Sequence, residues 1–143
     1  MKKIIYLLLI TFFAFSFANA QKKISAAKVP QEVMKSYNIK FPSAKKVIWR
    51  KIDVLYEAQV FIDKKVSFAT FEAGGSWIET LTEIKVSEIP SEVVEGVKKL
   101  YSSAIIKAAA IIEQSTNETL YIVQFRFKGK RGEVTLDKSG NQT

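Results

Sequence analysis

The sequence contains no cysteine and no histidine. Disulfide bonds are therefore impossible, and packing alone must hold the folded chain together. Imidazole bases, thiolate nucleophiles and the usual zinc and copper ligand sets are missing too. Ser-His-Asp and Cys-His catalytic arrangements cannot form without these side chains. We therefore expect that the protein is not an enzyme and has no cofactor.

Glycine is also scarce, and the remaining catalytic patterns are weak. Gly74-Gly75 is a lone turn signal and not the G-x-G-x-x-G loop that holds phosphate. Glu79 and Glu83 have the even spacing that places two carboxylates on one face of a strand. At roughly 3.3 Å per residue they would lie about 13 Å apart. This separation exceeds the roughly 5–9.5 Å of glycosidase carboxylate pairs, so we interpret both as solvated strand positions.

A pattern near the C-terminus partly matches a metal-binding loop. Asp137, Ser139 and Asn141 have the one-three-five spacing of a calcium loop. The glycine at position six and the closing glutamate of that loop are absent. We therefore expect a hairpin-type turn here and no metal site.

The N-terminus has the pattern of a secretory signal. Two lysines, at positions 2 and 3, precede an apolar run over residues 4–17, and Ala18-Asn19-Ala20 supplies the small residues that a signal peptidase reads. The run is shorter than the roughly twenty residues that span a membrane. We predict a signal peptide over residues 1–20, cleaved between Ala20 and Gln21. The protein is then periplasmic or secreted, with no stable membrane insertion after cleavage.

The remaining residues, 21–143, have the length of one domain. Loss of two lysines with the signal peptide lowers the net charge from +8 to +6. A mildly basic exported protein is attracted to acidic partners, such as anionic lipid headgroups or an acidic protein surface, although excess lysine also simply favours solubility. Basic and aromatic residues together can bind nucleic acid, but an exported protein rarely meets it, so we expect no nucleic-acid partner.

The chain repeats itself. Residues 29–34, Val-Pro-Gln-Glu-Val-Met, match the Ile-Pro-Ser-Glu-Val-Val sequence sixty positions later. Residues 56–60 match the five residues that lie 65 positions later. Two copies are too few for a solenoid. We therefore predict a duplication within one domain, with repeats over about 27–86 and 87–143, the second of which lacks a complete fourth strand.

Each repeat is predicted to begin with a helix and continue as a sheet. Pro30 and Pro90 suit the first helical turn, and apolar residues recur at helical spacing after both. Strict alternation of apolar residues around Val60 and Phe125 indicates half-buried strands and makes these two residues equivalent core positions. We expect about seven strands and two helices. The predicted class is α+β: a tandem duplicated α-β(4)-type unit, with an antiparallel sheet and two helices packed on one face.

The repeated motifs carry a resemblance to a known family. They are Val29-Pro30, Phe41-Pro42-Ser43-Ala44, Val47-Ile48-Trp49, Tyr56-Glu57-Ala58 and Gly74-Gly75-Ser76-Trp77. Together they resemble the PepSY-like exported bacterial proteins, a β-lactamase-inhibitor-like group. The resemblance implies a tandem α+β(4) arrangement and a non-catalytic binding role outside the cytoplasm, with no active-site residues. The second repeat lacks the matching tryptophans, so a binding surface symmetric between the repeats is not implied.

The strand alternation also predicts a binding face. If Val60 faces the helices, Phe61 faces away, and the same alternation turns Phe68 and Arg126 outward. Aromatic side chains beside guanidinium groups are typical of protein interfaces. The candidate binding residues are Trp49, Phe61, Phe68, Trp77, Arg126 and Lys128. The alternative is that the four aromatic residues cover one another or lie in the core.

Three functions follow as hypotheses. The first is a non-catalytic exported binding or inhibitor-like module that acts on a protein partner through the exposed sheet face. The second is a small-ligand or anionic-lipid binding protein of the cell envelope. The third is an enzyme, which the absence of histidine and cysteine disfavours. The sequence does not identify the partner.

Overall fold

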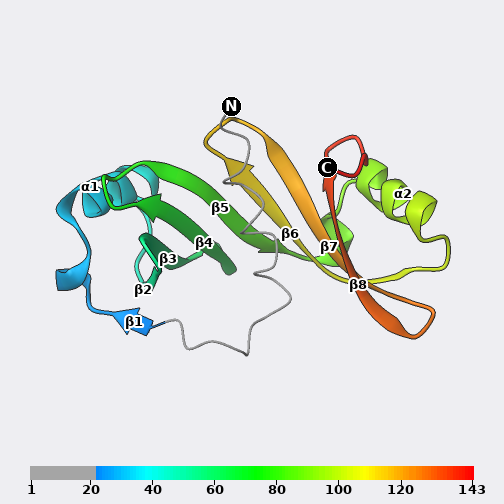
Figure 1. The fold of residues 1–143 in the computed structure, drawn as a ribbon, viewed down its shortest axis with the longest axis horizontal. Coiled ribbons are helices and arrows are strands. Elements are labelled where there is room, and N and C mark those ends of the chain that lie inside the picture. Colours follow the sequence, from blue (N-terminus) through cyan, green and yellow to red (C-terminus); the bar gives the residue numbers. More distant parts are fainter. Residues whose placement is uncertain (1–21) are drawn as a thin grey trace.

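The structure, a computed structural model, describes residues 22–143, so the predicted signal peptide and its cleavage site lie outside the described residues. Within this part, eight strands form one antiparallel sheet, and each strand pairs with its neighbours in the chain. The strands are β1 (Lys22–Ile24), β2 (Val47–Ile52), β3 (Leu55–Ile62), β4 (Lys65–Glu72), β5 (Trp77–Ile84), β6 (Ile105–Gln114), β7 (Thr119–Phe127) and β8 (Lys130–Asp137). Figure 1 follows the sheet from blue β1 at one end to orange and red β8 at the other.

Two helices accompany the sheet, at the positions that the apolar spacing predicted. They are α1 (Gln31–Lys40) and α2 (Ser91–Leu100), preceded by the short 3-10 helices η2 (Ala26–Lys28) and η3 (Val86–Glu88). Pro30 and Pro90 stand directly before the first helical residues, with φ of −55° and −57°. Proline favours this place because its ring fixes a suitable φ and its missing N–H has no helical partner there. The two helices lie toward opposite ends of the long axis, with β5 and β6 between them (Figure 1).

The expected fold class, an α+β domain built from a tandem duplicated α-β(4)-type unit, is wrong. About half of the residues lie in strands and only about a fifth in helices. β5 pairs directly with β6, from Glu79 opposite Gln114 to Ile84 opposite Ala109, so one continuous sheet replaces two four-stranded units. β1 adds an eighth strand at the edge, where about seven were expected.

Two apolar clusters, one with each helix, form most of the core. Val33 and Tyr37 of α1 belong to the first, and Val93 and Val97 of α2 belong to the second. The buried strand residues that they meet include Trp49, Tyr56, Ala58, Val60, Ala69 and Phe71 in the first cluster, and Ala109, Val123, Phe125, Val134 and Leu136 in the second. The predicted core positions of Val60 and Phe125 are confirmed.

The strand registers place both clusters on the same face of the sheet. Val60 pairs with Ser67, and Ser67 pairs with Thr82. Two residues further along β5, Ile84 pairs with Ala109 of the second cluster. Because alternate residues of a strand share a face, the two clusters continue one surface. We call the opposite surface, to which neither helical cluster belongs, the open face.

The two halves of the chain carry elements at matched positions. The bounds of α1 and α2 differ by sixty residues at both ends. The turns after β4 and β8 are closed by equivalent hydrogen bonds, from the Glu72 N–H to the Ser76 carbonyl at 2.9 Å and from the Asp137 N–H to the Asn141 carbonyl at 2.8 Å. A duplicated unit would produce such matches, and the division into repeats over 27–86 and 87–143 stays a prediction.

Candidate binding face

A row of polar residues crosses five strands of the open face. Arg50 of β2 pairs with Glu57 of β3, Glu57 with Thr70, Thr70 with Glu79, and Glu79 with Gln114 of β6. Glu57, Thr70 and Glu79 are buried. Two buried carboxylates in one row are costly unless hydrogen bonds or opposite charges accompany them. The partners of each carboxylate therefore determine whether its charge is compensated.

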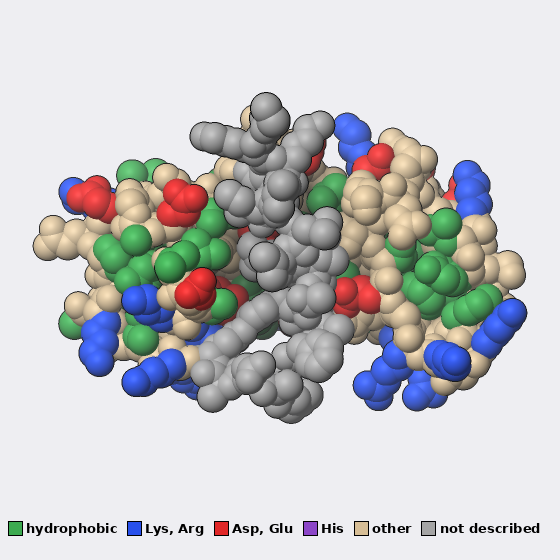
Figure 2. All heavy atoms as spheres, viewed as in Figure 1, with side chains coloured by type: hydrophobic (Ala, Val, Ile, Leu, Met, Phe, Trp, Pro, Cys, Tyr) green, Lys and Arg blue, Asp and Glu red, His purple; other side chains and the backbone are tan. Residues whose placement is uncertain are grey.

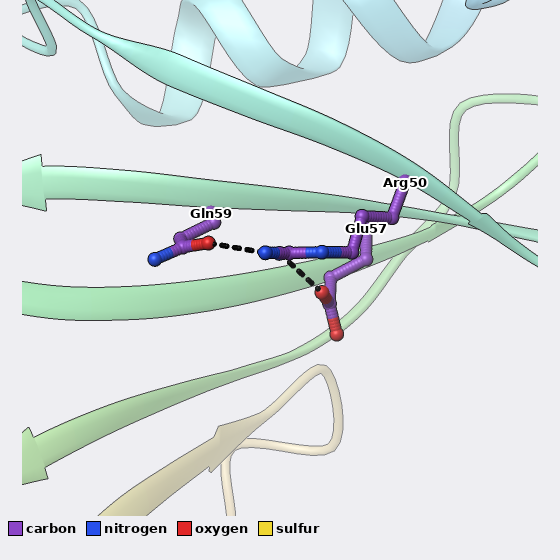
Figure 3. Close-up of polar contacts among 3 residues, drawn as sticks. All are labelled: Arg50, Glu57 and Gln59. Carbon is purple, nitrogen blue, oxygen red and sulfur yellow. Dashed lines mark hydrogen bonds and ion pairs between the residues drawn. The ribbon is translucent and has the colours of Figure 1, made fainter. Parts of the chain in front are cut away.

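Arg50 makes the best-defined polar contacts of the row (Figure 3). Its Nη1 lies 3.3 Å from Glu57 Oε1, and its Nη2 donates to Gln59 Oε1 at 2.7 Å. The Arg50 and Glu57 side chains are only 16% and 4% exposed. Burial raises the pKa of Glu57, and the charge and hydrogen bond of Arg50 oppose that rise. Removing either partner would leave the other charge buried and uncompensated. Each side chain is therefore needed to stabilise the other in this position.

Glu79 is the buried carboxylate of the row that has no ion-pair partner. It is 8% exposed, and none of the salt bridges within residues 22–143 includes it. Burial raises the pKa of Glu79, and the Gln114 side chain opposite it offsets part of that rise. The interpretation of Glu79 as a solvated strand position is therefore wrong, whereas Glu83 on the same strand is exposed.

The raised pKa of Glu79 gives a pH prediction. A carboxyl whose pKa is raised on folding contributes stability below its unfolded pKa of 4.5, and this contribution is lost as pH rises through the folded pKa. Glu79→Gln should therefore raise the unfolding free energy at pH 7 by about 1–3 kcal/mol, the scale of a buried group with incomplete partners. The gain should shrink toward pH 4 in urea unfolding curves. Glu83→Gln is the control, and equal pH profiles for the two variants would contradict the assignment.

A third apolar cluster lies beside the polar row on the open face. Its buried members are Leu81, Ala110, Ile112 and Ile122, with Phe68 and Leu120 packed against them. All six come from strands β4 to β7, and none from a helix. Four of them form a continuous row, because each pairs with the next: Phe68, Leu81, Ile112 and Leu120. An apolar centre with charged residues beside it is the composition of a protein interface with its polar rim.

Four of the predicted binding residues lie on the open face or at its margin. Phe61 is 39% exposed at the end of β3, and the Lys46 Nζ lies 5.8 Å from its ring centroid. Phe68 is half-buried in the open-face cluster. Arg126 is exposed at the end of β7, and Lys128 follows in the turn to β8. Phe61 and Arg126 lie on β3 and β7, with three strands between them.

The two tryptophans lie on the helical side of the sheet. Trp49 is buried, with its ring centroid 5.1 Å from that of Tyr37, and its indole nitrogen has no hydrogen-bond partner within residues 22–143. Trp77 is half-buried against the α1 cluster. Its Nε1 donates to the Thr80 hydroxyl at 3.0 Å, and the Lys40 Nζ lies 3.4 Å above its ring. The six predicted residues therefore do not form one site.

Sequence reasoning missed the polar row of the open face. Phe61, Gln59 and Glu57 are alternate residues, so strand spacing places all three on the outward face and could have predicted Glu57 there. The pairing of Arg50 with Glu57 depends on the β2–β3 register, which residue types alone do not set. Charged residues in a strand are usually solvated, so their burial had no sequence signal.

The C-terminal pattern that partly matched a calcium loop forms a turn. Asp137 accepts hydrogen bonds from the backbone N–H groups of Asn141 at 2.9 Å and Ser139 at 2.8 Å, and from the Asn141 side chain at 3.1 Å. These bonds, those from Asn141 first, lower the pKa of Asp137. Across residues 22–143, no group of three or more acidic side chains is arranged to hold a metal ion. No helix in the same range has the length and apolarity to cross a membrane.

Solved structures share this architecture. The chain superposes on a DUF2874 family protein from Bacteroides ovatus with a TM-score of 0.72 and 16% identity, over 79% of this chain and 83% of that one. For a proposed periplasmic protein from Bacteroides eggerthii the TM-score is 0.72 and the identity 14%, over 80% and 85% of the two chains. For a BLIP-like protein from Bacteroides fragilis they are 0.69 and 21%, over 80% and 83%. The fold is BLIP-like.

Similarity at this level shows the fold alone. No protein-family model and no curated protein matches the chain. In this BLIP-like fold, the helical side of the sheet is occupied by the two core clusters. The open face is therefore the candidate binding surface.

Proposed function

We propose that this chain is a non-catalytic exported module that binds a protein partner through the open face. The observation that carries the proposal is the apolar cluster around Leu81 and Ile112, which lies opposite the helical clusters and beside a row of charged side chains. The central residues of this cluster are buried and its edge residues, Phe68 and Leu120, are half-buried. An apolar centre with a polar rim is the composition of a protein interface. Phe61, partly exposed on the same face, is the proposed apolar anchor.

The proposed location is outside the cytoplasm. The signal-peptide pattern of residues 1–20 supports export. The description of the Bacteroides eggerthii protein as a proposed periplasmic protein is consistent with it. The repeated motifs support membership of the PepSY-like group within this BLIP-like fold. An inhibitor-like role is supported by the name of the Bacteroides fragilis protein, and no particular target enzyme is proposed.

Phe61→Ala tests the proposed interface. The side chain is 39% exposed, so its loss should leave the thermal unfolding midpoint nearly unchanged. It should weaken partner binding by more than about 1 kcal/mol, a cost that only a minority of interface residues reach and a factor of about five in affinity. The measurement is the affinity of the purified variant for the partner that the tagged wild-type protein retains from envelope extract.

Ile39→Ala is the matched control for this test. Ile39 lies on α1, on the helical side of the sheet, and is 81% exposed. Its replacement removes a comparable exposed apolar side chain and should change neither stability nor capture. Full-strength binding by folded Phe61→Ala protein, or equal losses for both variants, would contradict an interface on the open face.

A further inference from the structure

The tip of the β7–β8 hairpin concentrates positive charge. Residues 126–131 read Arg-Phe-Lys-Gly-Lys-Arg, with four cations and no carboxylate, and all four cations are exposed. Lys128 and Gly129 form the turn with positive φ of 50° and 77°, the backbone of a tight two-residue hairpin. Figure 2 shows blue side chains gathered at the lower right, where the orange hairpin tip lies in Figure 1. We call residues 126–131 the basic tip.

The charge of the basic tip is not compensated within the described chain. Arg126 and Arg131 are direct cross-strand partners. Like charges directly opposite each other destabilise a strand pair. None of the salt bridges within residues 22–143 includes a cation of the tip. Glu133, two residues further along β8, already accepts a hydrogen bond from Gln124 at 3.0 Å.

The chain contains an internal comparison for this hairpin. The β3–β4 hairpin lies 65 positions earlier, and there Phe61 pairs with Val66 where Arg126 pairs with Arg131. Its turn residues, Asp63 and Lys64, have the same positive φ, at 50° and 64°. The following Lys65 is bonded to Glu88 at 2.8 Å. The hairpin geometry therefore forms without arginines, so folding alone does not explain the basic tip.

We propose that the basic tip binds the phosphate headgroups of an anionic membrane surface. Guanidinium groups match phosphate oxygens in a two-pronged geometry, and two adjacent arginines would lose their mutual repulsion there. Ile105, the β6 partner of Arg126, is 59% exposed. An apolar side chain beside cations suits the boundary between headgroups and acyl chains better than an acidic protein surface. Such a contact would hold the domain at the membrane and leave the centre of the open face free.

Vesicle co-sedimentation of the purified protein tests the proposal. The probes are vesicles of phosphatidylglycerol and phosphatidylcholine, and vesicles of phosphatidylcholine alone. The wild type should bind the anionic vesicles only. The double variant Arg126→Gln/Arg131→Gln should lose about 30-fold in vesicle affinity, the expected effect of two cations near such a surface. Its thermal unfolding midpoint should be unchanged or higher, because the like-charge pair is gone.

The equivalent hairpin supplies the control. Lys64→Gln/Lys65→Gln removes the same charge and should lower vesicle affinity by less than about threefold, as a distant charge does when salt screens it. Phe61→Ala should bind vesicles like the wild type, which separates this site from the protein interface. Equal binding to both vesicle types, equal losses for the two double variants, or no binding at all would overturn the proposal. Tip-dependent binding of polyglutamate that exceeds vesicle binding would overturn it too, and would assign the tip to an acidic protein.

Discussion

Replacing Phe125 by alanine should lower the free energy of unfolding by about 3–5 kcal/mol, as truncation of a large core aromatic does. Phe125 is 4% exposed, and its ring centroid lies 4.4 Å from that of Tyr101. The ring also covers Gly132 of β8, where a Cβ atom would come within 2.6 Å of it. Its loss would leave a cavity that the neighbouring glycine has no side chain to fill.

Val60→Ala is the comparison for the stability loss expected of Phe125→Ala. Val60 occupies the equivalent position 65 residues earlier and is fully buried, but fewer atoms are removed, so the loss should be smaller. Urea unfolding followed by circular dichroism measures both variants. A midpoint unchanged by Phe125→Ala would show that the β7 strand phase is inverted and that the faces of the sheet are exchanged.

The second large effect is expected at Gly140, which joins the C-terminal turn to α2. Its φ is +82°, and a Cβ added to it would overlap the carbonyl oxygen of Glu92. Gly96 of the same helix lies against the Gly140 carbonyl, so two glycines allow the backbones to touch. Figure 1 shows the red C-terminal turn beside α2. Gly140→Ala should cost about 2–5 kcal/mol, combining an unfavourable left-handed residue with an overpacked contact.

Gly129→Ala separates these two contributions. Gly129 has a similar φ of +77°, but nothing lies within 4 Å of an added Cβ. Its replacement should cost only the conformational part, about 1–2 kcal/mol. Unfolding free energies of both variants decide the point. If Gly140→Ala is no worse than Gly129→Ala, the close packing of α2 on the turn is refuted.

Local pattern was enough to predict the helices and the strand phase. Pro30 and Pro90 marked the helix starts, and period-two alternation separated buried Val60 from exposed Phe61. These features depend on residues within one turn or one strand, where sequence spacing determines which side chains share a face.

Long-range pairing was not predictable in the same way. The β5–β6 register joins residues on either side of α2, so no local pattern reveals that the sheet is continuous. The register shift between Thr70 and Phe71 is a second feature that local alternation does not reveal. It places Trp77 opposite Phe71 on the helical side and Glu79 opposite Thr70 on the open face. Trp77 and Glu79 are two positions apart, so simple alternation would put both on the same face and misassign one of them.

The candidate site was predicted only in part. Outward positions for Phe61, Phe68 and Arg126 follow from strand phase alone. The burial of Glu57 and Glu79 does not, since it requires the neighbouring strands to be in place. The open face has carboxylates on β3 and β5 and an arginine pair at the β7–β8 tip. It is therefore more varied in charge than the aromatic and basic face that the strand alternation predicted.

Site-specific photo-crosslinking in cells that produce the protein tests the open-face interface most directly. A photoreactive phenylalanine analogue placed at Gln59 or Phe61 reports on the open face, and one placed at Ile39 or Leu100 reports on the exposed helical side. We predict a discrete crosslinked protein partner from the open-face positions and none from the helical positions. Adducts confined to Ile39 or Leu100 would contradict the assignment of the open face as the binding surface.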